Sequence, residues 1–241
     1  GFVSRGLGDV YKRQILLGAR TGRFDKSGAA KPMKPFAASS IPLVTVGVFI
    51  LWLGWFGFNG GSQLAMGTFD DAVAVSNIFI NTNLAACGGV LAAAVMTRLL
   101  AGKTDVVQML NGAIGGLVAI TAEPLAPAPI AAIFIGAIGG IIVVFGTKLL
   151  FNFKIDDVVG AVPAHLFAGI WGTLAVPLTN SDANFSAQLI GVLSINAFVF
   201  VVAYIVWAIM KNTMGIRLSK EAEKTGTDVT ETGVIAYAIK D

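Results

Sequence analysis

Apolar residues dominate this chain in long runs, which short polar or charged stretches separate. Six runs are long enough, or nearly so, to cross a hydrocarbon layer of about 30 Å as helices. The pattern predicts an all-α polytopic membrane helix bundle. Its expected crossing segments are 41–58, 72–96, 106–121, 130–150, 158–178 and 187–210.

The third segment is short and continues into a proline-rich turn, EPLAPAP, at 123–129. Because proline cannot continue a helix, we expect a broken or steeply placed helix there. Glycines recur four residues apart in two GAIGG strings, as Gly112 with Gly116 and Gly136 with Gly140. Small residues at this spacing let transmembrane helices approach closely, so the sequence predicts a compact bundle.

The two ends of the chain differ from its centre. Residues 1–14, GFVSRGLGDVYKRQ, resemble translated adapter or linker sequence, and they are left out of the prediction of the fold. Ile15 to Leu17 has the character of the last turn of an apolar span that is cut off upstream. We therefore expect a transmembrane domain, as a fragment of about six helices, at 15–214 and a solvated cytoplasmic tail at 215–241.

Composition excludes several classes of protein. With 55% hydrophobic and 13% charged residues and a mean hydropathy of +0.77, the chain is too apolar for a soluble domain of 241 residues. The charged residues, whose net charge is +3, lie between the apolar spans. This placement indicates that they orient the protein in a membrane and do not bind nucleic acid. Cys87 is the single cysteine and is expected to be a packing residue. The sequence contains no cofactor motif, metal-binding cluster or phosphate loop.

Basic residues occupy alternate loops. They follow the second segment at Arg98 and Lys103, flank the end of the fourth at Lys148 and Lys154, and follow the sixth at Lys211, Arg217, Lys220 and Lys224. The other loops carry Asp70, Asp71, Glu123 and Asp182 and no lysine or arginine. By the positive-inside rule, the basic loops and the C-terminus are predicted to be cytoplasmic.

His165 is the only histidine, and it lies in an otherwise apolar stretch from Lys154 to Val176. If this stretch is one helix, His165 lies about 12 Å along the axis from Asp157, near the middle of a bilayer. An ionisable side chain at that depth usually faces a bundle interior or a pathway, which indicates a functional site with a partner still to be found. The alternative is a core histidine that is hydrogen-bonded to a backbone carbonyl.

Aromatic residues gather where the first segment ends, in GWFGFNGGS at 54–62. Aromatic residues at a helix end are most often interfacial anchors. The interleaved glycines also leave room for the backbone to approach a pathway, where a cation could rest on the ring faces of Trp55 and Phe58. The residues alone leave both interpretations open.

Several motifs together resemble the ammonium transporter (Amt/Mep/Rh) family in their order and spacing. They are GWFGFNGGS at 54–62, FINT at 79–82, NGAIGGLVAITA at 111–122 and IDDVVGAVPAHLFAGIWGTLAV at 155–176. The resemblance runs from residue 16 to about 241 and includes LGARTGRF at 17–24 and MGIRLSKEAEKTGTD at 214–228.

The resemblance implies a fold of eleven transmembrane helices, of which the first ten form two inverted five-helix repeats. Such proteins assemble as homotrimers with one pore in each subunit. The six segments would correspond to the second repeat plus the final helix. Because inverted repeats form their substrate path at the repeat interface, a truncated chain would hold half of the pore.

The resemblance also implies roles for four residues. His165 would be the second of two adjacent pore histidines, and Trp55 and Phe58 would be aromatic pore residues, with Phe58 in the external gate. Ser62 would help to receive ammonium at the outer vestibule. The chain departs from the family at Gly160, where many members have an acidic residue, and at Pro163, which frees a backbone carbonyl one turn earlier and bends the helix.

The function implied is transport of ammonium or ammonia, with methylammonium as an analogue, and not enzymatic catalysis. The expected setting is the lipid bilayer of a bacterial inner membrane, with a PII-type regulatory protein as a further cytoplasmic partner. No nucleic acid is expected as a partner. The alternative is an ammonium sensor or regulatory membrane protein that signals through its tail.

Overall fold

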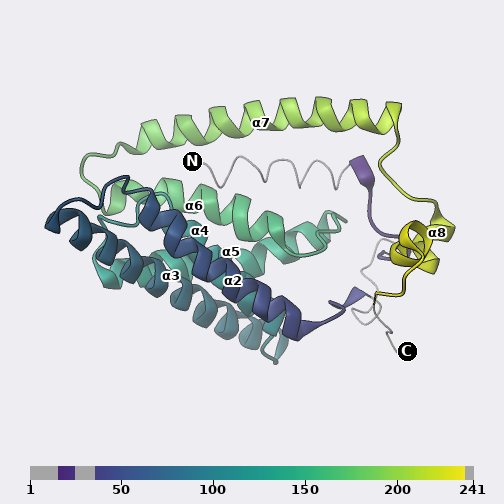
Figure 1. The fold of residues 1–241 in the computed structure, drawn as a ribbon, viewed down its shortest axis with the longest axis horizontal. Helices are drawn as coiled ribbons and strands as arrows, with labels where there is room; N and C mark the ends of the chain where they lie inside the picture. The colour runs from purple at the N-terminus through teal and green to yellow at the C-terminus, as the bar shows by residue number, and fades with distance from the viewer. Residues whose placement is uncertain (1–15, 25–35, 237–241) are drawn as a thin grey trace.

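The computed structural model describes residues 16–24 and 36–236, and these residues form helices and connecting turns (Figure 1). The helices of this part are α2 (Ile41–Gly61), α3 (Phe69–Ala101), α4 (Val106–Ile120), α5 (Pro129–Asn152), η2 (Val162–Phe167), α6 (Ala168–Ala175), η3 (Val176–Leu178), α7 (Phe185–Thr213), α8 (Lys220–Thr225) and η4 (Asp228–Thr232). Within it, α2, α3, α5 and α7 are long and apolar enough to cross a membrane, and α4 and Val162–Leu178 are shorter. The predicted all-α membrane bundle is confirmed.

Local capping sets where the helices begin and end. The side chain of Ser40 accepts a hydrogen bond from the Leu43 amide at the start of α2. Helix α3 extends beyond the predicted apolar segment at both ends, because Thr68 and Asp71 form a capping box before Phe69 and Gly102 closes the helix at φ +70°. Polar residues outside the apolar run are therefore still helical.

The centre of the bundle is formed by α3, α4 and α5, which make the most extensive helix contacts of the described chain. The predicted glycine faces lie against α3. A Cβ atom on Gly116 would lie 2.2 Å from the carbonyl oxygen of Ala85, and one on Gly136 would lie 2.0 Å from the same atom. Because no side chain fits there, α4 and α5 both pack with backbone contact on α3.

Helix α4 is the most enclosed helix, and every residue from Gly112 to Ile120 is buried. It is continuous, so the expected break is absent, and the chain turns only after Ile120. The proline-rich turn is fastened to α3, because Asn81 Nδ2 donates hydrogen bonds to the carbonyls of Pro124 (3.0 Å) and Pro127 (2.8 Å). The third segment is short because this turn ends it.

The segment that carries His165 differs from the single helix predicted from Lys154. Lys154 and Gly160 have φ angles of +59° and +74°, and the helical segment begins only at Val162 with the wide π-helical turn η2. Left-handed residues interrupt a right-handed helix, so the predicted 12 Å rise from Asp157 to His165 is wrong. Pro163 lies in the first turn of η2, where a proline removes no hydrogen bond of the helix, so the predicted bend of the helix stays a prediction.

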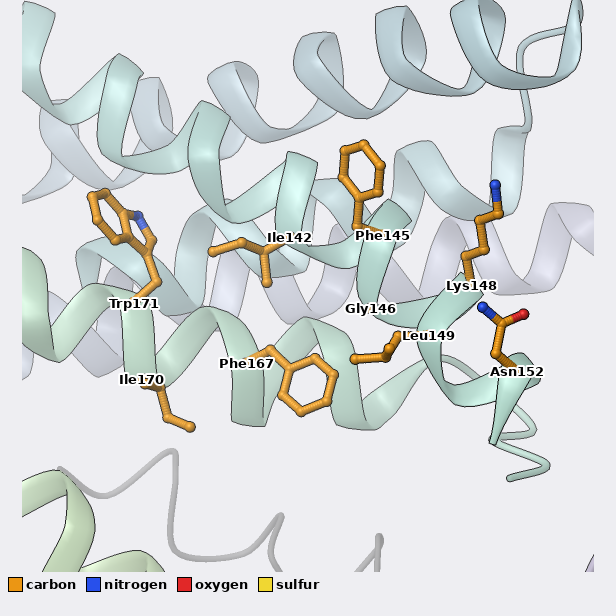
Figure 2. Close-up of a pocket in the computed structure, with 9 residues that line it drawn as sticks. All are labelled: Ile142, Phe145, Gly146, Lys148, Leu149, Asn152, Phe167, Ile170 and Trp171. Carbon is orange, nitrogen blue, oxygen red and sulfur yellow. The ribbon is translucent and has the colours of Figure 1, made fainter. Parts of the chain in front are cut away.

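Helices α5 and α6, together with η2, leave an open apolar groove between them, which Figure 2 shows in close-up. Helix α7 runs along the outside of the bundle next to α6, and Ala203 is its one buried residue among 185–213, all of which the structure describes (Figure 1). Residues 1–14, predicted to be foreign to the fold, lie outside the described residues.

Candidate functional site

Trp55 lies at the centre of the candidate site. Helix α2 places its side chain in a core cluster with Leu117 and Ala164, and the residue is 8% exposed. The indole Nε1 donates a hydrogen bond to Thr121 Oγ1 over 2.7 Å, and the Thr121 hydroxyl donates to the carbonyl of Leu117 over 2.6 Å. The polar edge of the indole is thereby satisfied, and its ring is held against α4.

His165 stacks beside this indole. The two ring centroids are 6.5 Å apart, with 27° between the ring planes. The residue is half-buried, and its Nδ1 atom is buried with no hydrogen-bond partner in the part of the chain that the structure describes. A buried imidazole nitrogen without a partner is costly, so this atom needs a group from elsewhere.

Phe58 and Ser62 continue from Trp55 along α2 towards its C-terminal end. The Phe58 ring meets the Trp55 ring edge-on at a centroid distance of 6.0 Å, and Phe58 is 44% exposed. Ser62 is the exposed C-cap residue, and its hydroxyl donates to the Phe58 carbonyl over 2.8 Å. The structure therefore brings Trp55, Phe58 and His165 together and places Ser62 at the helix end; the pore roles of all four residues stay predictions.

The turn before His165 is held by two side chains that sequence reasoning did not select. The carboxylate of Asp157 accepts hydrogen bonds from the amides of Gly160 (3.1 Å) and Val162 (2.8 Å). Asn111 Nδ2 donates to the carbonyl of Val159 over 3.0 Å. Val159 lies before the first residue of η2, so its carbonyl is outside the helix, and Asn111 satisfies it.

A buried hydrogen bond also joins two of the motifs found in the sequence. Asn59, in GWFGFNGGS, donates from Nδ2 to Thr82 Oγ1 over 2.9 Å, and Thr82 ends the FINT motif. Asn59 is 2% exposed and Thr82 is fully buried. This contact fixes α2 on α3 beside Phe58. The only sign of it in the sequence was that Asn59 and Thr82 each belong to one of the recognised motifs.

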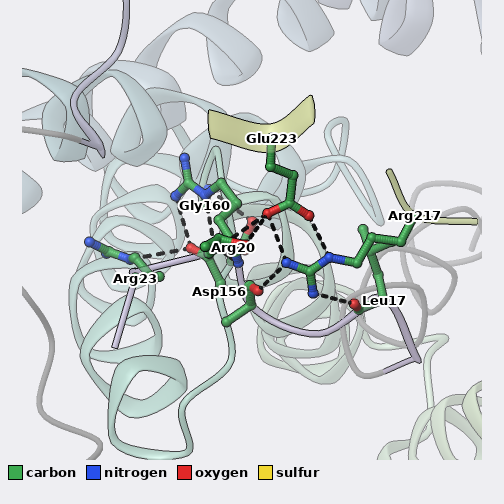
Figure 3. A network of polar contacts seen from close by, with 10 residues as sticks. Leu17, Arg20, Arg23, Asp156, Gly160, Arg217 and Glu223 are labelled. Atoms are coloured by element: carbon green, nitrogen blue, oxygen red, sulfur yellow. Dashed lines mark hydrogen bonds and ion pairs between the residues drawn. The ribbon is translucent and has the colours of Figure 1, made fainter. Parts of the chain in front are cut away.

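A second polar network lies at the end of the bundle near α8 (Figure 3). Arg20 donates from Nε and Nη2 to the two carboxylate oxygens of Asp156, over 2.7 and 2.8 Å, and Arg23 Nε lies 3.3 Å from Asp156 Oδ1. Arg217 pairs with Glu223 and donates from Nη1 to the carbonyl of Leu17 over 2.8 Å. The network joins the LGARTGRF loop to the start of the tail.

The carboxylates of this network are stabilised in the charged form. Burial opposes ionisation of Asp156, but the hydrogen bonds and charge of Arg20, with Arg23, outweigh it, and the pKa of Asp156 lies below its usual value. Hydrogen bonds from Arg217 and Thr21 lower the pKa of Glu223 to about 2. Both groups are therefore ionised at neutral pH.

The fold and the site together define a polytopic helical membrane protein with an aromatic and imidazole site inside the bundle. The sequence matches the Ammonium Transporter Family over residues 13–237, and the chain belongs to that family. This is a family of transporters and not of enzymes.

Relatives support the same assignment. The chain is 36% identical to the ammonium transporter Amt2 of Archaeoglobus fulgidus, over 92% of this chain and 50% of that protein. It is 38% identical to a putative ammonium transporter of Synechocystis, over 91% of this chain and 50% of that protein. The chain thus spans about half the length of the curated relatives it matches.

Solved structures share the fold. A structure titled "Sensor Amt Protein" matches with a TM-score of 0.87 and 28% identity, covering 95% of this chain and 57% of that one. Mep2 of Candida albicans matches with a TM-score of 0.76 and 25% identity, covering 95% of this chain and 53% of that one. The predicted fold family is confirmed.

Proposed function

We propose that this chain is the second half of an ammonium transporter and that the complete protein conducts ammonium or ammonia through a pore that His165 helps to form. One observation carries the proposal most directly. The buried Nδ1 of His165, beside the rings of Trp55 and Phe58, lacks a partner among the described residues. A second histidine from an upstream repeat would supply the missing hydrogen bond.

The mechanism follows from the cost of removing water from a cation. Ammonium loses hydration when it enters an apolar passage, and unpaired burial of its charge is expensive. The faces of Trp55 and Phe58 and the oxygen of Ser62 would replace part of that hydration at the outer end. His165 would then accept or donate a hydrogen bond to ammonia in the passage, since neutral imidazole does both.

Uptake of labelled methylammonium tests this function. The full-length protein that contains this chain is reconstituted in vesicles, and wild type is compared with His165→Ala. We expect wild type to accumulate methylammonium and His165→Ala to lose either the flux or the selectivity over potassium. If the variant keeps both at wild-type values, the proposed role of His165 is wrong.

The extent of the chain is part of the proposal. The DNA upstream of the codon for Ile15 should continue the reading frame through five more apolar spans with another mid-membrane histidine. A start codon at this point instead would mean that a half-length protein forms its pore from several copies or does not conduct. That outcome would overturn the pore assignment.

Assembly and orientation are proposed on the same family basis. We place the basic loops and the C-terminus in the cytoplasm of a bacterial cell, with the protein as a homotrimer in the inner membrane and a PII-type protein as a regulator. Accessibility of a cysteine at position 220 to an impermeant maleimide in intact cells tests the orientation. Labelling without permeabilisation would place the tail outside.

A sensor is the second candidate, because the neighbour with a TM-score of 0.87 is titled a sensor. In this case the tail, which the Arg217–Glu223 pair fastens to the 17–21 loop, would transmit occupancy of the site. Equilibrium binding of methylammonium without flux in the same vesicles would favour the sensor. Flux without any change in the tail would favour the transporter.

A further inference from the structure

Two short helical segments of the bundle end side by side. Helix α4 ends at Ile120, and the segment that carries His165 ends at Leu178. A Cβ atom on Gly172 would lie 2.3 Å from the carbonyl oxygen of Ala119, so α6 packs on α4 with backbone contact. A glycine contact allows close approach but offers no side-chain ridge that resists sliding of one helix along the other. The register of the two segments therefore depends on other contacts.

Glu123 supplies such a contact just beyond the two helix ends. Its Oε2 atom accepts a hydrogen bond from Nδ2 of Asn180 over 2.8 Å. Its Oε1 atom accepts from the backbone amides of Leu125 (3.2 Å) and Ala126 (3.1 Å), so the same carboxylate also shapes the proline-rich turn. Hydrogen bonds to a carboxylate are about twice as strong as those between neutral groups, and they are directional. The side chain of Glu123 is therefore held in one orientation.

Both turns that this bond joins are ordered by further hydrogen bonds. The amide of Asn180 donates to the carbonyl of Val176 over 3.0 Å, and Asn180 Oδ1 accepts from the amide of Asp182 over 2.9 Å. On the other side, Asn81 fastens the proline-rich turn to α3 through two proline carbonyls. The bond between Glu123 and Asn180 can therefore transmit the position of one turn to the other.

The same bond connects the supports of the two stacked rings. Thr121 accepts the indole N–H of Trp55 and lies two residues before Glu123. His165 belongs to the helical segment that ends two residues before Asn180. A slide of that segment along α4 would carry the imidazole across the indole, with which it stacks at a centroid distance of 6.5 Å.

We propose that Glu123 and Asn180 form a brace that sets the register of the His165 segment on α4 and so positions the imidazole against Trp55. Both are positioning residues, which act through the two rings and not by contact with a substrate. Their effect on transport rests on the function proposed above. The rival interpretation is that Glu123 attracts cations by its charge alone.

An exchange of donor and acceptor tests the brace in the full-length protein. Glu123→Gln sets an amide N–H group against Nδ2 of Asn180, and Asn180→Asp sets one carboxylate against another. In the double variant, the amide at position 123 donates to the carboxylate at position 180, so the bond returns with its direction reversed. Hydrogen–deuterium exchange at 176–182 should be faster in each single variant and return to the wild-type rate in the double variant. A wild-type rate in Glu123→Gln would overturn the brace.

Kinetics of methylammonium uptake in vesicles test the positioning role. We expect the KM of Glu123→Gln to rise about twofold to fivefold, the effect of losing one exposed cation–π contact, with an unchanged maximal rate per folded protein. Glu123→Asp keeps the charge but is one methylene too short to reach Asn180, so its KM should rise equally. The double variant should regain the wild-type KM. Asp182→Asn removes a charge from the same loop and keeps the backbone amide that binds Asn180, so it should be neutral.

The remaining outcomes separate the interpretations. A wild-type KM in Glu123→Asp, with a raised KM in Glu123→Gln, would assign the effect to charge and overturn the proposal. A double variant that stays impaired would overturn it as well. Absence of flux in the wild type would instead contradict the proposed function, and the exchange rates at 176–182 would still decide whether the brace exists.

Discussion

The indole Nε1 of Trp55 lies 2.7 Å from Oγ1 of Thr121, and this hydrogen bond joins α2 to the end of α4 beside the ring of His165. Thr121 also donates to its own helix, at Leu117, so its hydroxyl oxygen is oriented to accept from the indole. The plane of the Trp55 ring, against which His165 stacks, is therefore set by a hydrogen bond to a residue of another helix.

Thr121→Val should destabilise the full-length protein and lower methylammonium uptake, because it removes the acceptor for a buried N–H group. In a double-mutant cycle with Trp55→Phe, we expect a coupling energy of about 1 kcal/mol, which is typical of hydrogen bonds between membrane helices. Thermal unfolding in detergent measures it. Thr173→Val is the control, since the Thr173 hydroxyl donates within its own helix, to Gly169. A coupling energy near zero would show that the bond does not hold the indole.

Gly160→Ala should lower the free energy of unfolding by more than about 1–2 kcal/mol, which is the cost of a left-handed backbone for alanine. The added Cβ would also lie 2.5 Å from Asn111 Nδ2, so Asn111 would have to leave the carbonyl of Val159. Gly102→Ala is matched, because Gly102 has a φ of +70° with no atom near its Cβ position. Equal losses in the two variants would mean that the contact with Asn111 has no cost.

The attachment of the tail to the 17–21 loop should weaken only at acidic pH, where Glu223 becomes protonated. Glu223 has a pKa of about 2 in the folded chain, against an ordinary value of 4.5, so its contribution to stability is complete above about 4.5. It is lost as the pH falls towards 2. A spin label at position 220, in a Cys87→Ala background, should stay ordered down to about pH 4 and become mobile below it.

Substitution gives the same test at neutral pH. Glu223→Gln should release the spin label at pH 7, because Arg217 and Thr21 lose the charged acceptor. Glu221→Gln, on the same short helix and with no side-chain hydrogen bond or ion pair to the described residues, should not. A label that stays ordered in Glu223→Gln would show that other contacts hold the tail.

Asp156→Asn should cost about 3 kcal/mol of unfolding free energy, because removal of one partner leaves the charges of a buried ion pair without compensation. The side chains of Asp156 and Arg23 are each 2% exposed. Chemical unfolding of the full-length protein measures this loss, and Asp182→Asn, at an exposed carboxylate, should be neutral within 0.5 kcal/mol by the usual behaviour of surface changes. A neutral Asp156→Asn would show that solvent reaches the pair.

The sequence predicted the membrane helices well because length and hydropathy are local properties of the chain. Segments 41–58 and 106–121 begin at the observed first residues of α2 and α4. The glycine faces at Gly112, Gly116, Gly136 and Gly140 were also predictable, since spacing alone places them on one side of a helix.

The segment around His165 could not be derived in the same way. Its apolar run reads as one helix, but the backbone at Gly160 is left-handed, and that conformation depends on Asn111 and Asp157. Asn111 lies 48 residues away in the chain, so no local pattern connects it to the carbonyl of Val159. Thr121 could not be identified from the sequence for a similar reason, because its hydrogen bond with Trp55 forms only where α2 meets the end of α4.

The shortness of α4 has an electrical consequence. Its 15 residues span about 22 Å, less than the hydrocarbon thickness of about 30 Å. With the start of α4 at the cytoplasmic headgroups, as in the orientation proposed above, the polar turn after Ile120 would lie below the level of the opposite headgroups. Water at that turn would carry the bulk potential inward, and the transmembrane voltage would fall over a shorter distance than the lipid alone would set. In the proposed pore, a cation at Trp55 would then have crossed little of the electric field, and most of the work of about 2.3 kcal/mol per charge per 100 mV would be done beyond it.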